Sequence, residues 1–160
     1  VAVAPDGRIT VGWQDNRTDS EPLWTGQTFS GEGTDPDNWQ IMLRTRTANS
    51  ADWGTPQSLG ADDQADRHPA LAYDAQNRLV VAWDSKPLKS SGVNLVVLSA
   101  VANASGEFSA PTAIDVGPQG MGQYPRLGVQ PNGQVRVVWT DGRALDWRWR
   151  VMTAVFGGSS

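Results

Sequence analysis

Two short motifs place an aspartate and an arginine two residues apart, shortly after a tryptophan that ends a strand-like run. The first copy contains Trp13, Asp15 and Arg17, and the second contains Trp139, Asp141 and Arg143. A carboxylate and a guanidinium at this spacing can form a bidentate ion pair that fixes a loop, or they can bind hydroxyl or carboxylate groups of a ligand. Because the pair recurs, a structural role is favoured. Ligand binding by Asp141 and Arg143 is the alternative.

A second group of candidate ligand contacts lies in two short segments that end in proline. The segment ADRHP (65–69) contains Arg67 and His68, and GQYP (122–125) contains Tyr124. We interpret both segments as connections that bring these side chains to one face. The chain has one histidine, which excludes a metal site built from several histidines. A lone histidine beside a proline is more often a hydrogen-bonded loop residue than a general base.

The segment 18–39 is an insertion rich in acidic and aromatic residues. Asp35 and Asp37 are candidate Ca²⁺ ligands, because Ca²⁺ takes about six to eight oxygen ligands; a solvated acidic loop is the alternative. Trp24 in this segment and Trp147 near the end of the chain are candidates for stacking on sugar rings. Long loops on a rigid scaffold often carry function, so these residues are candidate ligand contacts.

Composition excludes several function classes. The 160 residues fit one domain, and the net charge of −4 disfavours binding to nucleic acid or to an anionic membrane. No apolar run is long enough to span a bilayer. The absence of cysteine excludes disulfides and thiolate chemistry.

A third strand-like run ends in Trp83, and the three copies together reveal an internal repeat that covers the chain. Each copy reads as a short strand, a tight turn and a second strand that ends in Trp13, Trp83 or Trp139. The turns are PDG (5–7), AQN (75–77) and PNG (131–133). Gly and Asn tolerate the positive φ that a tight hairpin needs, so the sequence predicts three β-hairpins.

Further strands follow each hairpin. The segments 39–47, 94–101 and 149–155 read as third strands, and 53–59 and 108–114 read as fourth strands that contain a proline. Proline is confined to edge strands, so the fourth strand should be outermost. No segment shows helical periodicity. The sequence therefore predicts an all-β protein built from four-stranded antiparallel meanders.

Repeated four-stranded meanders are the blades of a β-propeller. We expect a blade at 1–68, a second at 69–124 and an incomplete third at 125–160, as a segment of a propeller of about six to eight blades. The alternative is that several copies of the chain assemble into one ring.

The turns after the third strands add a family resemblance. They read TANSADW (47–53) and ANASGEF (102–108), in which Asn49 and Asn103 stand where an Asp-box has its aspartate, and Trp53 and Phe108 where it has its aromatic residue. The chain resembles the bacterial sialidase-like propeller repeats of the BNR type. The resemblance implies structural roles for Trp53 and Phe108. It also implies an extracellular, cell-surface or periplasmic protein.

The resemblance does not extend to a sialidase active site. We find no Phe-Arg-Ile-Pro stretch, and neither the arginine triad nor the catalytic tyrosine and glutamate of that family can be placed. We therefore assign no catalytic residue and no cofactor other than the candidate Ca²⁺. The expected function is a recognition or scaffold module that binds glycans. The alternatives are part of a glycoside hydrolase, with catalytic residues partly outside the segment, and a self-assembling homo-oligomeric propeller module.

Overall fold

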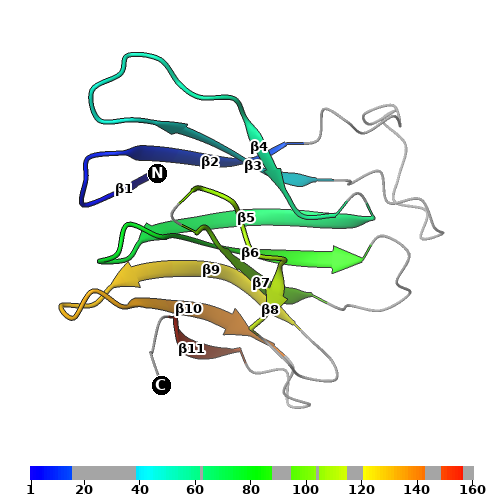
Figure 1. Cartoon of the computed structure of the whole chain (residues 1–160). Coiled ribbons are helices and arrows are strands. Elements are labelled where there is room, and N and C mark those ends of the chain that lie inside the picture. Colours follow the sequence, from blue (N-terminus) through cyan, green and yellow to red (C-terminus); the bar gives the residue numbers. More distant parts are fainter. Residues whose placement is uncertain are drawn as a thin grey trace.

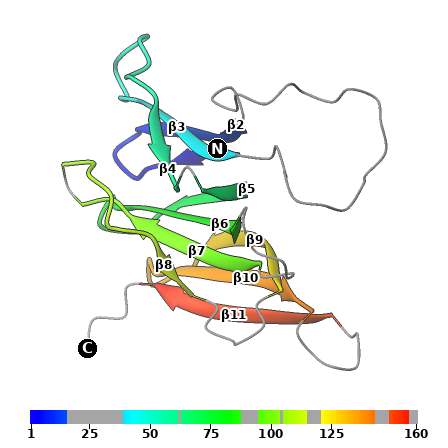
Figure 2. The ribbon, with the colours of Figure 1, turned by 90° about the vertical axis from the view of Figure 1, so that its right-hand side faces the viewer.

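The computed structural model of the chain describes residues 1–15, 39–61, 63–87, 95–103, 105–114, 121–142 and 149–156. Within these residues there are strands and turns but no helix, so no helix could span a membrane. Eleven strands form three antiparallel sheets that lie one after another (Figures 1 and 2). The predicted all-β architecture is confirmed.

Strand order within each sheet follows the chain. The first sheet contains β1 (Ala2–Val3), β2 (Ile9–Asp15), β3 (Gln40–Arg46) and β4 (Gln57–Leu59). The second contains β5 (Gln64–Tyr73), β6 (Leu79–Pro87), β7 (Val96–Val101) and β8 (Thr112–Ala113). The third contains β9 (Gly122–Val129), β10 (Val135–Asp141) and β11 (Arg150–Phe156). Each sheet is therefore the predicted meander, and β4 and β8 are outermost.

The outermost strands are shorter than the sequence predicts. Pairing begins at Gln57 in β4 and at Thr112 in β8, in each case directly after a proline. Because proline has no N–H to donate to a neighbouring strand, the continuous ladder is interrupted at Pro56 and Pro111, and before Pro111 pairing resumes only as an isolated bridge between Ala102 and Phe108. The continuous strands are therefore shorter than the predicted ranges 53–59 and 108–114.

The predicted hairpin turns are confirmed, and they also touch one another. Gly7, Asn77 and Gly133 have φ of 86°, 60° and 81°. The amide of Asp6 donates to Asn77 Oδ1 (3.1 Å), and the amide of Ala75 donates to the carbonyl of Gly133 (3.1 Å). The turns thus connect each sheet to the next.

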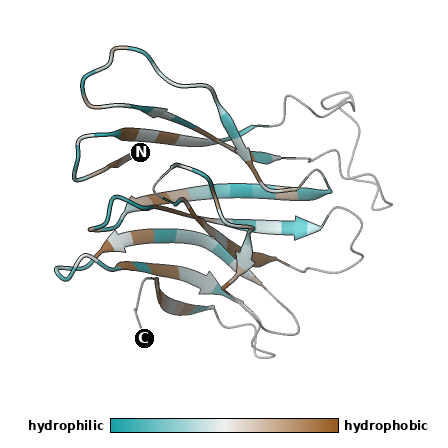
Figure 3. Ribbon diagram, viewed as in Figure 1, coloured by the Kyte–Doolittle hydropathy of each residue, from teal (hydrophilic) through white to brown (hydrophobic). Residues whose placement is uncertain are grey.

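The core lies between the sheets. Trp83 is fully buried and packs with Ile41 and Leu43 of the first sheet, whereas Trp139 packs with Ala82 and Val97 of the second. Figure 3 shows apolar residues concentrated in the strands and polar residues at the turns. Trp83 and Trp139 therefore pack between neighbouring sheets.

Two strands are longer than predicted. The segments 65–69 and 122–125, interpreted as connections, form the first halves of β5 and β9, which begin at Gln64 and Gly122. A β-bulge accommodates Pro69 inside β5 and Pro125 inside β9. Both strands therefore begin before the divisions expected at 68/69 and 124/125.

Candidate functional site

The two bulges place equivalent residues of neighbouring sheets in an unusual backbone conformation. His68 has a φ of 53° and Tyr124 a φ of 55°, a region that non-glycine residues rarely occupy. The register shifts by one residue at each site, so two residues oppose Trp83 in β6 or Trp139 in β10. Bulges redirect side chains and are common beside functional sites.

Each bulge is held by a side chain of the preceding sheet. The amide of His68 donates to Gln14 Oε1 (3.0 Å), and the amide of Tyr124 donates to Asp84 Oδ2 (2.9 Å). Gln14 and Asp84 each directly follow the tryptophan of their repeat. A residue added by a bulge has no partner in the ladder, and a buried N–H needs an acceptor. These two side chains supply it.

Asp84 also binds the ring of His68. Its side chain is 4% exposed, and its two oxygens lie 3.1 and 2.9 Å from His68 Nδ1. The rings of His68 and Tyr124 meet at a centroid distance of 4.6 Å and an interplanar angle of 56°. The His68 side chain is 38% exposed and Tyr124 is 47% exposed. We call His68, Tyr124 and Asp84 the bulge platform.

A second buried acid lies beside the platform at the junction of the first two sheets. Asp66 is fully buried and accepts hydrogen bonds from Trp83 Nε1 (2.9 Å) and from the amide of Ala61 (3.3 Å). Burial raises the pKa of the Asp66 carboxyl, and the charge of Asp84 raises it further, although hydrogen bonds from Ser85, Trp83 and Ala61 oppose the shift. Because Asp66 is enclosed by these donors, its role is structural.

Among the predicted ligand contacts that the structure describes, His68 and Tyr124 lie together. The guanidinium of Arg67 lies over the ring of Trp39 in the first sheet, 5.7 Å from its centroid. Asp141 is buried at the end of β10. The remaining candidates fall outside the described residues: Arg17, Trp24, Asp35, Asp37, Arg143 and Trp147.

The residues predicted to stabilise the repeat have contacts that fit that role. Asp15 accepts a hydrogen bond from Trp13 Nε1 (3.0 Å), and Phe108 packs against the first core cluster. Arg46 lies over the ring of Trp53, 5.7 Å from its centroid. Asn103 Oδ1 caps the amides of Ser105 and Glu107, whereas in the first turn it is Ser50 Oγ that caps Asp52.

Sequence reasoning missed Asp84, Gln14 and Asp66. A signal for the first two existed, because both occupy the position after the repeat tryptophan while a residue-proline pair follows in the next repeat. In the described part of the chain, no group of three or more acidic or histidine side chains could hold a metal ion. Two hollows, of about 220 and 510 Å³, lie elsewhere: one beside the hairpin turns at Asp74 and Asn132, the other at the outer edge between Gln57 and Phe108.

Comparison with known proteins supports the fold. No protein-family model and no curated protein matches the chain. Among solved structures, the chain is similar to the Hadza microbial sialidase Hz136, with a TM-score of 0.68 and 11% sequence identity over 98% of this chain and 34% of that chain. A thermostable family-43 glycoside hydrolase is a more distant match, with a TM-score of 0.41 and 12% identity over 76% of this chain and 48% of that chain.

The chain thus spans about a third of the length of the sialidase. At this identity the likeness concerns the fold and not the activity. The Asp-box repeat and the bacterial origin stay predictions. The three consecutive meanders, together with the likeness over nearly the whole chain, identify an all-β fold of β-propeller blades.

Proposed function

We propose that the chain is a glycan-recognition module and that the bulge platform contacts the sugar. One observation carries this proposal: two bulges of neighbouring sheets present His68 and Tyr124 side by side, and both are fixed by the buried carboxylate of Asp84. Two matching departures from regular strand geometry, converging on one exposed pair of rings, favour a binding site.

The chemistry of the platform suits a sugar. The apolar C–H face of a pyranose can stack on the exposed ring of Tyr124, while its hydroxyls need directional hydrogen bonds of the kind that an imidazole offers. Asp84 fixes both residues in advance, which lowers the entropic cost of binding. The fold likeness to a sialidase is compatible with a carbohydrate ligand.

The enzymatic alternative has weaker support. Glycosidases typically use a pair of neighbouring acids, and the charge of Asp84 contributes to the raised pKa of Asp66. Asp66 is fully buried, however, and its oxygens accept bonds from Trp83 and Ala61. Sugar recognition by the platform is therefore the favoured function, and glycoside hydrolysis is the alternative.

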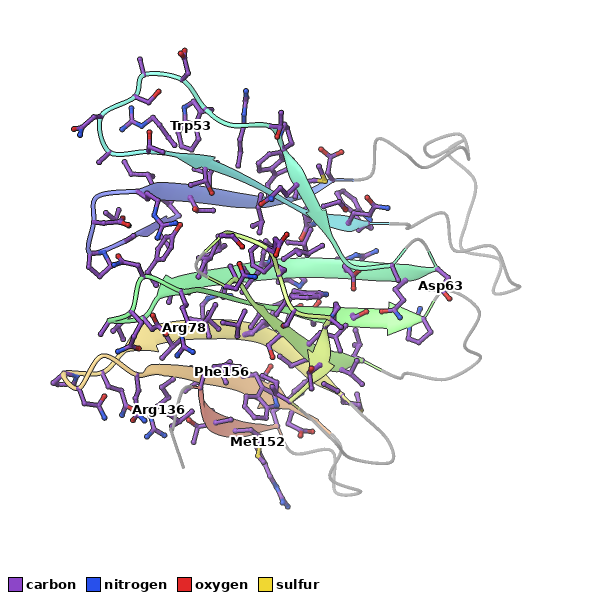
Figure 4. All side chains as sticks on the ribbon, viewed as in Figure 1. Trp53, Asp63, Arg78, Arg136, Met152 and Phe156 are labelled. Carbon is purple, nitrogen blue, oxygen red and sulfur yellow. The ribbon has the colours of Figure 1, made fainter. Side chains whose placement is uncertain are left out.

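A glycan array with the purified chain tests the proposal. Tyr124→Asn and His68→Asn are suitable variants because asparagine tolerates positive φ better than most residues. We expect Tyr124→Asn to weaken binding about tenfold or more, in line with the loss of an aromatic anchor. Trp53→Ala is the control, since Figure 4 places Trp53 on the turn after β3, away from β5 and β9.

The outcomes separate the functions. Binding that Tyr124→Asn removes and Trp53→Ala retains supports recognition at the platform. Release of a shortened glycan would support the glycosidase alternative. Equal binding by the parent and Tyr124→Asn would exclude the platform as the binding site.

A further inference from the structure

We propose that a second binding site lies in the hollow beside the hairpin turns, and that it takes a small ligand through a neutral amide group. The hollow has a volume of about 220 Å³, and Asp74, Arg78, Asn132 and Phe156 are among the residues that line it. We call it the turn hollow. It shares no residue with the bulge platform, so this proposal goes beyond the function proposed above and does not rest on it.

A buried carboxylate holds the guanidinium of Arg78 at the turn hollow. Asp74 Oδ2 lies 2.6 Å from Arg78 Nε, and the Asp74 side chain is 5% exposed. Asp74 Oδ1 accepts the amides of Gln76 (2.9 Å) and Arg78 (2.8 Å), which fixes the carboxylate in turn. A guanidinium carries five N–H donors in a planar fork. The bond at Nε therefore leaves the two terminal nitrogens of Arg78 to donate elsewhere.

The counterpart of Arg78 in the first sheet shows what such a guanidinium binds. Arg8 and Arg78 each directly precede the second strand of their hairpin. Arg8 Nε is likewise paired with an aspartate, Asp6 (2.9 Å), and Arg8 Nη2 donates to the carbonyl of Asn77 in the turn of the next sheet (3.0 Å). At the first junction, the acceptor for the terminal nitrogen is thus a neutral backbone carbonyl.

At the second junction, the equivalent carbonyl has another partner. Gly133 is the counterpart of Asn77 in the third sheet, and its carbonyl accepts the amide of Ala75 (3.1 Å). Within the described part of the chain, Arg78 donates through Nε and its own amide, and no acceptor contacts its terminal nitrogens. These donors therefore face the turn hollow, which Arg78 lines.

The turn hollow also has an apolar wall. At the first junction, Arg8 lies over the ring of the buried Tyr73, the last residue of β5, 5.5 Å from its centroid. The last residue of β9 is the smaller Val129, which is 54% exposed, so the second junction is less completely filled at this end. Phe156 lines the hollow from the end of β11, and Figure 4 shows it near Arg78 at the turn end of the sheets.

Charge and size determine which ligand fits. Among the described residues that line the hollow, only Arg78 and Asp74 are charged, and their charges compensate each other. An anion therefore gains little Coulomb energy there, whereas a neutral carbonyl can accept from the guanidinium as Asn77 does from Arg8. The volume is below the about 300–1,000 Å³ of a drug-sized site, which suits one small group. An acetamido group combines the carbonyl with a methyl that can contact Phe156.

An NMR titration of the parent with N-acetylglucosamine tests the site. The backbone amides of residues 74–78 and 132–134 should shift and saturate at about millimolar concentration, since so small a group supplies little binding energy. Glucose and glucosamine, which lack the amide, should bind about tenfold more weakly or worse because the bond to the charged donor is lost. Sodium acetate should also bind more weakly, because Asp74 opposes its charge.

Two arginine variants locate the donor. Arg78→Gln removes the guanidinium and should weaken the binding of N-acetylglucosamine about tenfold or more. Arg8→Gln is the matched control, because it removes the same kind of aspartate-paired guanidinium from the first junction, where Asn77 already accepts from it. This control should bind as the parent does. The dispersion of each amide spectrum shows whether the variant is folded.

Saturable shifts that Arg78→Gln loses and Arg8→Gln keeps would support the site. Absent shifts with N-acetylglucosamine, equal shifts with glucose, or parent-like binding by a folded Arg78→Gln would overturn it. Tighter binding of acetate would also overturn it, because the hollow would then be an anion site. If Arg78→Gln does not fold, the comparison of the ligands on the parent still decides. Because the reporting amides lie outside the bulge platform, failure here leaves the proposed function untouched.

Discussion

Asp66 is an acid that the fold keeps away from water. It is fully buried at the junction of two sheets, and its two oxygens accept bonds from Trp83 and Ala61. Gly60 completes the enclosure: its φ is +107°, and a Cβ at this position would overlap the Asp66 carboxylate. The contacts satisfy the carboxyl, but burial still penalises its charge.

This burial predicts a specific dependence of stability on pH. Burial raises the pKa of Asp66 above the ordinary value of 3.8, so the folded chain favours the neutral acid. The stabilising contribution of Asp66 is complete below pH 3.8 and is lost as pH rises through the raised pKa. Relative to Asp66→Asn, the parent should lose unfolding free energy as the pH rises over that window.

Urea denaturation of both proteins from pH 3.5 to 8 measures the difference. Asp52→Asn, which changes an exposed acid, is the matched control and should follow the parent at every pH. A constant difference between the parent and Asp66→Asn across the range would contradict the assigned cause of the shift.

Within the strands, the alternation of apolar and polar side chains was the sequence pattern that best predicted the fold. Val135, Val137 and Trp139 are buried, while the residues between them point to the other face, and such alternation predicts a half-buried strand. The hairpin turns were predicted equally well from their glycine and asparagine residues. The effect of proline on strand length could not be predicted, because proline precedes the start of β4 and β8 but lies within a β-bulge inside β5 and β9.

The platform could be predicted only in part. His68 and Tyr124 stood out as residues before prolines, but Asp84 did not. Its contacts reach 16 residues back to His68 and 40 residues forward to Tyr124. Such pairs form only when three strands of two sheets meet, so neither strand propensity nor periodicity reports them.

The link between sheets also predicts an effect on stability. Gln14 on β2 holds the bulge of β5 by accepting the amide of His68 (3.0 Å). Gln14→Ala leaves that amide without its acceptor, which should lower the unfolding free energy by about 1–3 kcal/mol. Thermal or urea denaturation measures the loss.

Gln57→Ala is a suitable comparison for this change. Gln57 lies on the outermost strand β4 and is exposed, so its truncation should cost within about 0.5 kcal/mol. Equal losses in the two variants would mean that the bond to His68 contributes nothing specific.

In the whole molecule, the third sheet has one face that nothing covers within the described chain. Val138, Trp149, Val151 and Val155 are 37%, 57%, 77% and 41% exposed. Val138 pairs with Thr153, and Arg136 pairs with Val155. Because directly paired residues of two antiparallel strands lie on the same face of a sheet, these residues of β10 and β11 share this face. Figure 4 shows β11, marked by Met152 and Phe156, at the end of the row of sheets.

The internal repeat indicates what packs against the equivalent face of another sheet. Ala82 on β6 is the counterpart of Val138, since each directly precedes its repeat tryptophan, and Ala82 is buried under the third sheet. The opposite end of the molecule offers a matching surface, where Trp13 is only half-buried and Val3 is 63% exposed. A head-to-tail contact between two copies would repeat the existing sheet-to-sheet junction.

We therefore predict that the isolated 160-residue chain associates through this face. Light scattering on a size-exclusion column should give a mass above that of one chain, and Val151→Lys should return it toward the monomer, because a charge in a packed apolar contact is costly. Val129→Lys is the control: Val129 is 54% exposed but pairs with Val135, on the other face of the sheet. A parent that elutes as a monomer at high concentration would show that the face needs no partner.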